Sequence, residues 1–369
     1  MLVKNERLRA FAIGALIGGY VVLNIGQFLF HCSSTDFRGQ YEYAPYSPAS
    51  RGVAAAAILG ANKNEENQSS KSANSDVRNL SRTLPIDVRC PIDWKTNSSV
   101  AEKLDCRKRL PDVIGIGVSK CGTGALSFFL DMHPYLVHSH KPKEVYFWND
   151  NFNRGMDWYR DIMPVSSKYQ LTMEKTPTYI RDKRVPLLIK SMLPSTTKFI
   201  VVVRDPVLRL VSSYVHNIVT AGKPLRRALN PAGFKKTFLS NKGDVKETNT
   251  ALRHGLYDEL LRAWLEVFPR DRFLVVDGHQ LETNPLPVLQ EVEYFLALPK
   301  YFDESKIYFN KTKGFYCKHQ LDGEDVCMRE GKGRPHPFVA EDVERKLKDF
   351  YHPHNLIFER MVGKSFTWA

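Results

Sequence analysis

The fold of this chain is decided by residues Pro111 to Leu130, which have the sequence PDVIGIGVSKCGTGALSFFL. Val113 to Val118 form an uninterrupted apolar run in which β-branched residues alternate with glycine, a pattern typical of a buried parallel strand. The run ends in a turn of small residues, and apolar residues at helical spacing follow from Ala125 to Leu130. The stretch therefore predicts a strand, a turn and a helix.

The turn between this strand and helix is suited to bind a phosphate. Successive backbone N–H groups from Ser119 to Gly124, together with the N-terminus of the following helix, form a cradle for an anion. Lys120 adds a positive charge and Thr123 a hydroxyl. The turn is not a Walker A loop, in which the lysine follows the last glycine. A nucleotide triphosphatase is therefore disfavoured, and an ordinary glycine-rich turn without a ligand is the alternative.

Downstream of this turn, predicted strands alternate with predicted helices. Strand-like apolar cores lie in QLTMEKTPTYI, TKFIVVVRDP and DRFLVVDG. Helical spacing of apolar residues occurs at 207–219, 252–268, 285–296 and 341–350. This alternation predicts an α/β fold with a mainly parallel central sheet flanked by helices, and a ligand site at the carboxyl ends of the strands.

Arg204 and Ser212 provide a second candidate phosphate site. A predicted strand ends at Val203, so Arg204 lies at the carboxyl end of the sheet, and Ser212 follows about two turns into the next helix. The alternative is an ion pair of Arg204 with Asp205, because an acidic residue is stabilised at a helix N-terminus. The position of Arg204 downstream of the first phosphate turn favours phosphate binding.

The N-terminal part of the chain predicts a membrane anchor and a stem. Basic residues precede Ala10 to Phe30, a 21-residue stretch without charge, which is long enough to cross a bilayer as a helix. A signal peptide is the alternative, but the stretch exceeds a usual h-region and no A-x-A-like site follows closely. The basic residues predict a cytoplasmic tail at 1–9. The polar, Ser- and Asn-rich residues 31–109 predict a luminal stem before a folded domain at 110–369.

Sequons and cysteines suit a luminal location. Glycosylation sequons begin at Asn67, Asn79, Asn97 and Asn310. Cys317 and Cys327 are the first candidates for a disulfide, which would close a loop of about ten residues, and Cys90 with Cys106 is a second candidate pair. The chain has no C-x-x-C motif and no His/Cys cluster at zinc spacing, so a metal site is not predicted.

Six segments of this chain resemble motifs of the heparan sulfate sulfotransferases, in the same order. They are GVSKCGTGAL, EVYFWNDNFNRGMDWYRDIMP, MEKTPTYI, VVVRDPVLRLVSSY, FNKTKGFYC and GKGRPHP. The likeness is greatest to the glucosaminyl 3-O-sulfotransferases and covers roughly Leu110 to the C-terminus. It implies a sulfotransferase, P-loop-like fold with a phosphosulfate-binding turn. It also implies a type II Golgi membrane enzyme that moves the sulfuryl group of 3′-phosphoadenosine-5′-phosphosulfate (PAPS) to the 3-OH of glucosamine in heparan sulfate.

The resemblance also implies which residues bind the donor. Lys120 to Gly124 would hold the 5′-phosphosulfate, Arg204 and Ser212 the 3′-phosphate, and Lys332 to His336 would close over the nucleotide. The full implied donor set is Lys120, Cys121, Gly122, Thr123, Gly124, Arg204, Ser212, Tyr316, Lys332, Gly333, Arg334, Pro335 and His336. A solvated basic loop is the alternative for Lys332 to His336.

Catalysis is likewise carried over from the resemblance, with Glu144 as the base. Sulfuryl transfer to a sugar hydroxyl needs a carboxylate that removes the hydroxyl proton and cations that offset charge on the leaving phosphate, here Lys120 and Lys175. Without the resemblance, Glu144 would more often be a surface partner of a neighbouring lysine. The implied acceptor residues are Glu144, Val145, Tyr146, Phe147, Trp148, Asn149, Asp150, Lys175, Thr176, Pro177 and Thr178.

Two departures from the family pattern bear on activity. The 3-O-sulfotransferases usually carry Glu-x-His-Phe-Phe-Asp, whereas this chain has Tyr146 in place of the His and Asn149 in place of the acid. Asn also occurs there in N-sulfotransferases, so an N-sulfotransferase-like activity is one alternative. A catalytically weak polyanion-binding relative is another, and Asp150 is a candidate to replace the acid. Cys121 in the phosphate turn is the second departure, because its side chain requires a negative φ or strain there.

The charge of the chain fits a polyanionic partner. A net charge of +13 and a pI of about 9.3 suit heparan sulfate. Nucleic acid is disfavoured, because no RNA- or DNA-binding motif occurs and a luminal chain rarely meets it. Candidate cations for binding the polysaccharide are Lys141, Lys143, Arg181, Lys183, Arg184, Arg226, Arg227 and Arg253.

Overall fold

The computed structural model describes residues 88–96, 98–139, 142–319, 325–328 and 335–369, all within one compact unit, Lys63–Ala369. The predicted tail, the predicted anchor, most of the predicted stem and the sequons at Asn67, Asn79 and Asn97 lie outside these residues. Of the helices that can be described, none combines the length and apolarity needed to span a bilayer.

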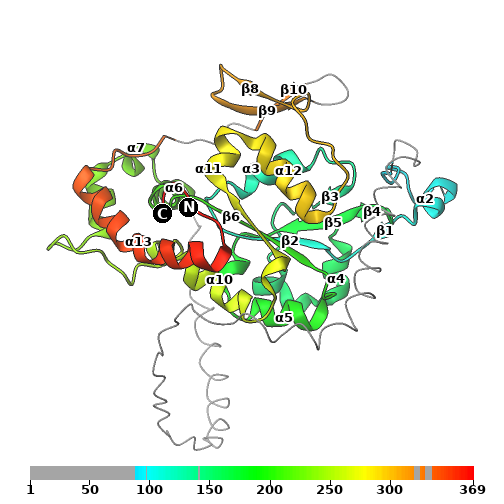
Figure 1. The fold of residues 1–369 in the computed structure, drawn as a ribbon, viewed down its shortest axis with the longest axis horizontal. Helices are drawn as coiled ribbons and strands as arrows, with labels where there is room; N and C mark the ends of the chain where they lie inside the picture. The colour runs from blue at the N-terminus through cyan, green and yellow to red at the C-terminus, as the bar shows by residue number, and fades with distance from the viewer. Residues whose placement is uncertain (1–87, 97, 140–141, 320–324, 329–334) are drawn as a thin grey trace, which may run out of the picture. The chain divides into compact units, whose positions relative to one another are not determined.

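A sheet of five parallel strands forms the centre of this unit (Figure 1). The strands lie in the order β3 (Leu136–His138), β5 (Leu171–Lys175), β2 (Val113–Gly117), β6 (Lys198–Val203) and β7 (Phe273–Asp277). All residues of β2 and β7 are buried, as are five of the six in β6. Strands covered on both faces bury every side chain, which explains their continuous apolar runs. The predicted parallel sheet is therefore confirmed.

Helices cover both faces of the sheet (Figure 1). On one face lie α3 (Thr123–Leu130), α11 (Gly278–Thr283) and α12 (Pro285–Leu296). On the other lie α5 (Val185–Met192) and α10 (Tyr257–Leu265). The remaining α-helices are α2 (Ser98–Leu104), α4 (Gly155–Asp161), α6 (Pro206–Thr220), α7 (Leu225–Ala228), α8 (Pro231–Phe238), α9 (Thr250–Arg253) and α13 (Glu341–Val362). A second apolar cluster joins α6, α8, α9 and α13.

The prediction of one continuous helix at 252–268 is wrong, because this part of the chain forms two helices, α9 and α10. Gly255 lies in the break, and a Cβ on it would approach the ring of Tyr351 to within 2.9 Å. The Tyr351 hydroxyl donates to the carbonyl of Leu252 at 2.9 Å, so a side chain from α13 uses an oxygen that a continuous helix would use itself. Tertiary packing thus overrides the helical spacing.

The C-terminal helix is longer than the predicted 341–350, because α13 continues through Pro353 to Val362. Proline removes one helical N–H and usually ends or bends a helix. Here the buried stripe of Leu347, Tyr351, Phe358 and Val362 lies on both sides of Pro353 and is packed into the apolar clusters. This burial keeps the two halves in one helix. The predicted helices at 207–219 and 285–296 are confirmed by α6 and α12.

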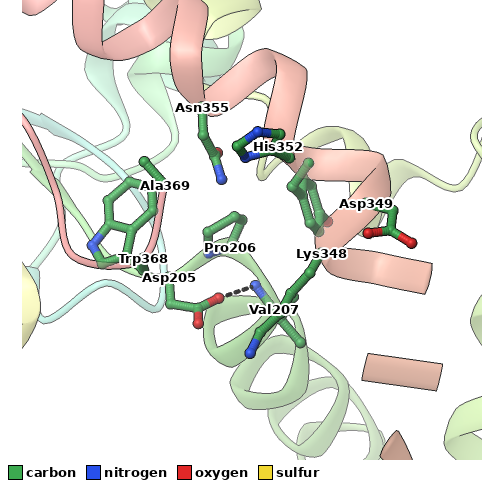
Figure 2. A pocket seen from close by; sticks show the side chains of 10 residues that line it. Asp205, Pro206, Val207, Lys348, Asp349, His352, Asn355, Trp368 and Ala369 are labelled. Carbon is green, nitrogen blue, oxygen red and sulfur yellow. Dashed lines mark hydrogen bonds between the residues drawn. The ribbon is translucent and has the colours of Figure 1, made fainter. Parts of the chain in front are cut away.

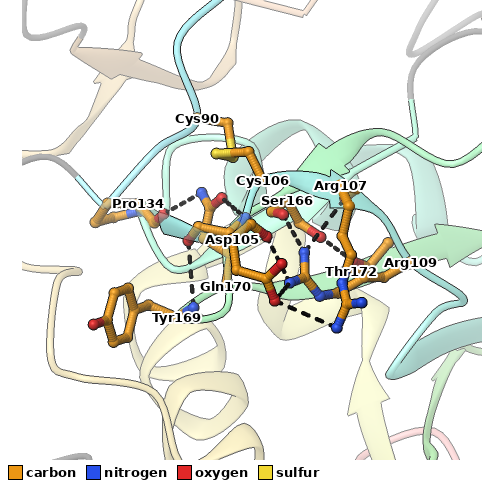
Figure 3. The surroundings of a disulfide bond; sticks show 11 residues. Cys90, Asp105, Cys106, Arg107, Arg109, Pro134, Ser166, Tyr169, Gln170 and Thr172 are labelled. Atoms are coloured by element: carbon orange, nitrogen blue, oxygen red, sulfur yellow. Dashed lines mark hydrogen bonds and ion pairs between the residues drawn. A yellow bond between two sulfur atoms is a disulfide. The ribbon is translucent and has the colours of Figure 1, made fainter. Parts of the chain in front are cut away.

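The folded region begins before Leu110, where the stem was predicted to end (Figure 3). Cys90 and Cys106 form a disulfide, as the second candidate pairing predicted. β1 (Arg107–Lys108) pairs with β4 (Val165–Ser166), and the guanidinium of Arg109 bonds the Asp105 carboxylate at 2.8 Å. Residues 88–96 and 98–109 therefore fold onto the domain despite their polar composition, because covalent and hydrogen-bonded partners hold them.

A small antiparallel sheet carries the second disulfide. It consists of β8 (Ile307–Asn310), β9 (Phe315–His319) and β10 (Asp325–Val326). The predicted bridge between Cys317 and Cys327 is present. β9 also packs against α11, so this sheet is attached near the helix that follows β7.

Candidate active site

The phosphate turn follows β2 directly, and α3 begins at Thr123. Two residues of the turn have left-handed backbone conformations, Lys120 with φ +76° and Gly122 with φ +103°. Cys121 between them is not in that region, so the negative φ predicted for it is met. The first N–H groups of α3 lack helical partners and point out of its N-terminus. The turn thus presents a lysine and the N-terminus of α3 at the carboxyl edge of the sheet.

Cys121 connects the phosphate turn to the second candidate phosphate site. Its side chain is buried, and its Sγ lies 3.4 Å from the hydroxyl of Tyr257 on α10. That hydroxyl donates to the backbone carbonyl of Arg204 at 2.8 Å. Burial raises the pKa of the Cys121 thiol, which keeps it neutral. The cysteine therefore packs inward and helps to set the spacing of the two turns.

Arg204 lies between the end of β6 and the start of α6. Its guanidinium is within 3.7 Å of the Glu282 carboxylate, and its Nε is buried with no hydrogen-bond partner among the described residues. Asp205 is not its ion-pair partner, because one Asp205 oxygen caps α6 by accepting from Val207 at 2.7 Å. The guanidinium of Arg204 therefore keeps donor capacity for a phosphate.

A cavity of about 220 Å³ lies on the Asp205 side of this turn, between the start of α6, α13 and the C-terminal residues (Figure 2). Asp205 and Lys348 line it together with Trp368 and Ala369. None of its lining residues belongs to the predicted donor or acceptor sets. The cavity is therefore separate from the predicted site.

The remaining predicted donor residues are partly described. Partial burial lowers the pKa of His336, and the nearby positive charges of Arg204 and Lys120 lower it further. His336 therefore lies near both phosphate turns. Tyr316 is half-buried on β9, with its ring 5.3 Å from that of Phe309. Ser212 is half-buried on α6, whereas Lys332, Gly333 and Arg334 lie outside the described residues.

Glu144 and Lys175 form the central ion pair of the site. The Lys175 Nζ lies 2.7 Å from the Glu144 Oε1, and Lys175 is 3% exposed. Lys175 ends β5 and is paired in register with Gly115 of β2. A Cβ on Gly115 would lie 2.7 Å from the Lys175 Cγ, so only glycine leaves room for this lysine. Gly115 in the apolar strand therefore makes room for a lysine of the site.

Tyr146 gives Glu144 its second partner. The Tyr146 hydroxyl donates to the Glu144 Oε2 at 2.5 Å. Burial pushes the pKa of Glu144 upward, but Lys175 and the Tyr146 hydroxyl outweigh it and hold the pKa below its ordinary value. Burial and the bond to Glu144 raise the pKa of Tyr146 to about 12, so Tyr146 stays a donor. Glu144 is thus an oriented, ionised carboxylate.

The phosphate turn and the Glu144 loop are neighbours. The Ser119 hydroxyl donates to the carbonyl of Pro177 at 3.3 Å, and the Thr176 N–H donates to the carbonyl of Gly115 at 2.9 Å. Pro177 follows Lys175 by two residues. An ionised carboxylate and its lysine therefore lie beside a cradle for a phosphate. This is the arrangement that transfer of an anionic group to a hydroxyl requires.

Several predicted acceptor residues have buried side chains. Val145, Phe147, Trp148 and Thr176 are at most 3% exposed, so they support the loop and cannot face a saccharide. The Asn149 amide donates to the Thr178 hydroxyl at 2.9 Å, and Asp150 is exposed. The side chains of the loop that remain accessible are those of Glu144, Tyr146, Asn149 and Asp150.

Arg181 adds a positive charge near the acceptor side. One of its guanidinium nitrogens lies 3.2 Å from the His254 Nδ1, and burial together with Arg181 and Arg209 lowers the pKa of His254 to about 4. His254 is therefore neutral. Burial and the neighbouring Arg209 lower the pKa of Arg181, whereas Tyr146 and Asp150 on the acceptor side oppose this shift. Among the other predicted polysaccharide-binding cations, Arg184 and Arg253 are paired with Asp182 and Glu259.

Three tyrosines of the site were not predicted from the sequence as functional residues. Tyr257 lies between the two phosphate turns, while Tyr159 and Tyr179 surround the buried Glu174. Their spacing along the chain gives no local signal, because Tyr257 contacts the turns after β2 and β6, whereas Tyr159 and Tyr179 both contact Glu174 on β5. Only Tyr179, four residues after Lys175 in a strand-end segment, had a position that suggested the site.

The fold and site define a sulfotransferase, and comparison with known proteins agrees. Residues 110–363 match the family model described as the sulfotransferase domain. The solved sulfotransferase from Alicyclobacillus acidocaldarius has the same fold, with a TM-score of 0.50 and 18% identity, covering 70% of this chain and 98% of that one.

The curated relatives are more specific. Mouse heparan sulfate glucosamine 3-O-sulfotransferase 6 is 40% identical over 71% of this chain and 75% of its own length. Mouse heparan sulfate glucosamine 3-O-sulfotransferase 3B1 is 39% identical over 71% of this chain, and the match spans 65% of its length. This chain belongs to the heparan sulfate glucosamine 3-O-sulfotransferase family.

Proposed function

We propose that this chain transfers the sulfuryl group of PAPS to the 3-OH of glucosamine residues in heparan sulfate. The observation that carries the proposal is the Glu144–Lys175 ion pair of 2.7 Å beside the phosphate turn. Membership of the 3-O-sulfotransferase family supports the acceptor and the position. The net charge of +13 supports a polyanionic acceptor.

Each residue of the site has its own role in the proposed transfer. Glu144 accepts the proton of the acceptor hydroxyl as its oxygen attacks sulfur, while the bond from sulfur to the bridging phosphate oxygen breaks. Lys120 and the N-terminus of α3 offset the charge that grows on the departing phosphate. Lys175 and Tyr146 keep Glu144 ionised and fix its two oxygens. Arg204, with its unpartnered Nε, holds the 3′-phosphate of the donor.

Tyr146 takes over the orienting role that a histidine has in the family pattern. Its hydroxyl already donates to the carboxylate of the base, so the replacement keeps a hydrogen bond to Glu144. This observation favours an active enzyme over a catalytically weak polyanion-binding relative. The Asn149 amide is engaged by Thr178, and no contact of Asn149 favours N-sulfation.

The direct test is Glu144→Gln, which keeps size and polarity but cannot accept a proton. Turnover should fall by about 10²–10⁴-fold, while affinity for the product 3′-phosphoadenosine-5′-phosphate (PAP) stays close to wild type. Glu266→Gln, which changes an exposed carboxylate after α10 that belongs to neither predicted site set, is the matched control and should retain activity. Disaccharide analysis of heparan sulfate treated with labelled PAPS reports the sulfated position. If Glu144→Gln keeps most of the transfer, the base lies elsewhere and the assignment is wrong.

We also propose that the chain is a single-pass type II protein of the Golgi membrane with a luminal catalytic domain. The uncharged stretch from Ala10 to Phe30, the basic residues before it and the two disulfides support this location. In sealed microsomes, the domain should be protected from protease and its N-glycans should be sensitive to glycosidase after detergent is added. Protease digestion without detergent would contradict the proposed orientation.

A further inference from the structure

Glu174 is a buried carboxylate that the mechanism above does not use. It precedes Lys175 on β5, and its side chain is inaccessible to solvent. Its Oε1 accepts from the Tyr159 hydroxyl at 2.9 Å, and its Oε2 accepts from the Thr176 hydroxyl at 3.0 Å. The Tyr179 hydroxyl is a third hydrogen-bond partner. One carboxylate therefore accepts hydrogen bonds from three hydroxyl groups.

Each of these hydroxyls also holds the loop that follows Glu144. The Thr176 Oγ1 accepts from the backbone N–H of Val145 at 3.0 Å and from that of Tyr146 at 3.2 Å. The Tyr179 oxygen accepts from the backbone N–H of Phe147 at 2.9 Å. The Tyr159 oxygen accepts from the Trp148 Nε1 at 3.1 Å. Four consecutive residues after the base are thus bound to three hydroxyls in turn.

The direction of these hydrogen bonds depends on Glu174. A hydroxyl has one proton and can accept at its lone pairs, whereas an ionised carboxylate only accepts. When each hydroxyl donates its proton to Glu174, its oxygen is left to accept an N–H from the loop. A neutral amide at position 174 would place an NH₂ donor against at least one of the hydroxyls. That hydroxyl would lose its acceptor and would have to rotate its O–H bond away.

We propose that Glu174 is a positioning residue for the base, which sets the polarity of three hydroxyls that in turn fix the loop carrying Glu144. The inference rests on the proposed function, since it assigns the loop a catalytic purpose. The cost of the arrangement points the same way: burial raises the pKa of Glu174 to about 7, so the ionised form that accepts from all three hydroxyls dominates above that pH, and an apolar residue would be easier to bury. A site that needs a fixed carboxylate accounts for that cost.

The first test is Glu174→Gln in the full-length chain. Misplacing a catalytic group by about 1 Å can cost up to about 100-fold, so turnover should fall by about 10–100-fold. The acceptor KM and the PAP affinity should stay within about threefold of wild type, because the phosphate turns are untouched. In a Glu144→Gln background, the same change should have little further effect on turnover, because the group it positions is gone. The inference is overturned if Glu174→Gln lowers turnover equally in the wild-type and Glu144→Gln backgrounds, or if it does not lower turnover in the wild-type background.

A second pair of variants covers the case in which Glu174→Gln does not fold. Thr176→Val removes one of the three hydroxyls, and Thr176→Ser keeps it. Thr176→Val should lose turnover with KM unchanged, and Thr176→Ser should retain more activity than Thr176→Val. Equal activities of the two variants would overturn the role of the hydroxyl.

Amide hydrogen exchange at residues 145–147 provides a readout independent of activity. Exchange there should be faster in Glu174→Gln and in Thr176→Val than in wild type, since hydrogen bonds to these amides are weakened. If wild type transfers no sulfate, the proposed function fails, but faster exchange still supports the link from Glu174 to the loop. If exchange is unchanged while wild type is active, the link itself is wrong.

Discussion

At the scale of single residues, Tyr146 shows how a side chain outside the family pattern can fit the site. Its backbone lies in the left-handed region at φ +52°, which is uncommon for a bulky residue. The Thr176 hydroxyl accepts from its N–H, and its own hydroxyl donates to Glu144. Two specific contacts thus offset an unfavourable backbone conformation and direct the ring toward the base.

The first prediction concerns the pH dependence of Tyr146→Phe. The Tyr146 hydroxyl stabilises the ionised form of Glu144 and helps to hold its pKa below the ordinary value. Loss of this donor should raise the pKa of Glu144, and the base acts only when deprotonated. The acidic limb of the kcat/KM profile should therefore move to higher pH, and wild type and variant should be compared across the acidic range. A limb that stays in place or moves to lower pH would show that another group controls it.

The second prediction concerns the two donor cations. Lys120→Ala and Arg204→Ala should each weaken PAP binding by about tenfold or more, because a phosphate loses a charge-assisted partner. Calorimetry with PAP measures this directly. Lys190→Ala, on the exposed face of α5, is the control for loss of one positive charge and should leave PAP affinity nearly unchanged. Wild-type affinity in both site variants would refute the donor assignment.

At the scale of elements, α10 connects the two turns that follow β2 and β6. Tyr257 begins this helix and is 2% exposed. Its hydroxyl lies against the Cys121 thiol and donates to the Arg204 carbonyl. A helix from later in the chain thereby fixes the distance between two strand ends. The cysteine that departs from the family pattern is part of this contact.

The third prediction is that Tyr257→Phe lowers the free energy of unfolding by about 1–2 kcal/mol. The change leaves a partly buried carbonyl at Arg204 without its donor, and such a loss typically costs about this much. Denaturant unfolding measures the difference. Tyr294→Phe serves as the matched control, because Tyr294 is 87% exposed and should lose almost nothing. An equal stability of the two variants would mean that the Tyr257 contact contributes no net stability.

At the scale of the whole molecule, lysine and arginine side chains can offset the negative charge of the sulfuryl donor and of the polysaccharide acceptor. The chain carries a net charge of +13, and the site contributes Lys120, Lys175, Arg181 and Arg204. Among the residues that the structure describes, no group of three or more His, Cys, Asp or Glu side chains is arranged to hold a metal ion. The proposed mechanism assigns the charge at the leaving phosphate to Lys120 and the N-terminus of α3, whereas Lys175 is paired with Glu144.

The fourth prediction is therefore that chelators leave sulfate transfer intact. Lysine side chains supply the positive charge that a divalent ion supplies in other transferases. Transfer to heparan sulfate should be measured after dialysis of the full-length protein against EDTA, with readdition of Mg²⁺, Mn²⁺ or Ca²⁺ as separate samples. Loss of activity that one metal restores would contradict the assignment of Lys120 to the leaving phosphate.

The amino-acid sequence by itself determined the parallel strands, the phosphate turn and most helices. These features depend on local patterns: residues buried on both faces must be apolar, and a turn that cradles a phosphate needs small residues and a lysine. The disulfide between Cys317 and Cys327 was also predictable, since the cysteines lie close in sequence. The roles of Glu144 and Lys175, by contrast, came from the family resemblance, because an isolated Glu or Lys carries no such signal.

Only the tertiary structure decided which side chains meet. Lys175 reaches Glu144 across 31 positions, and Cys121 reaches Tyr257 across 136. The break between α9 and α10 depends on Tyr351 from the distant α13, which no local periodicity indicates. The three hydroxyls around Glu174 likewise come from two separate segments, Tyr159 from α4 and both Thr176 and Tyr179 from the residues after β5. Local patterns specify which residues are buried, whereas hydrogen-bond partners are specified by the packing of elements that are far apart in the chain.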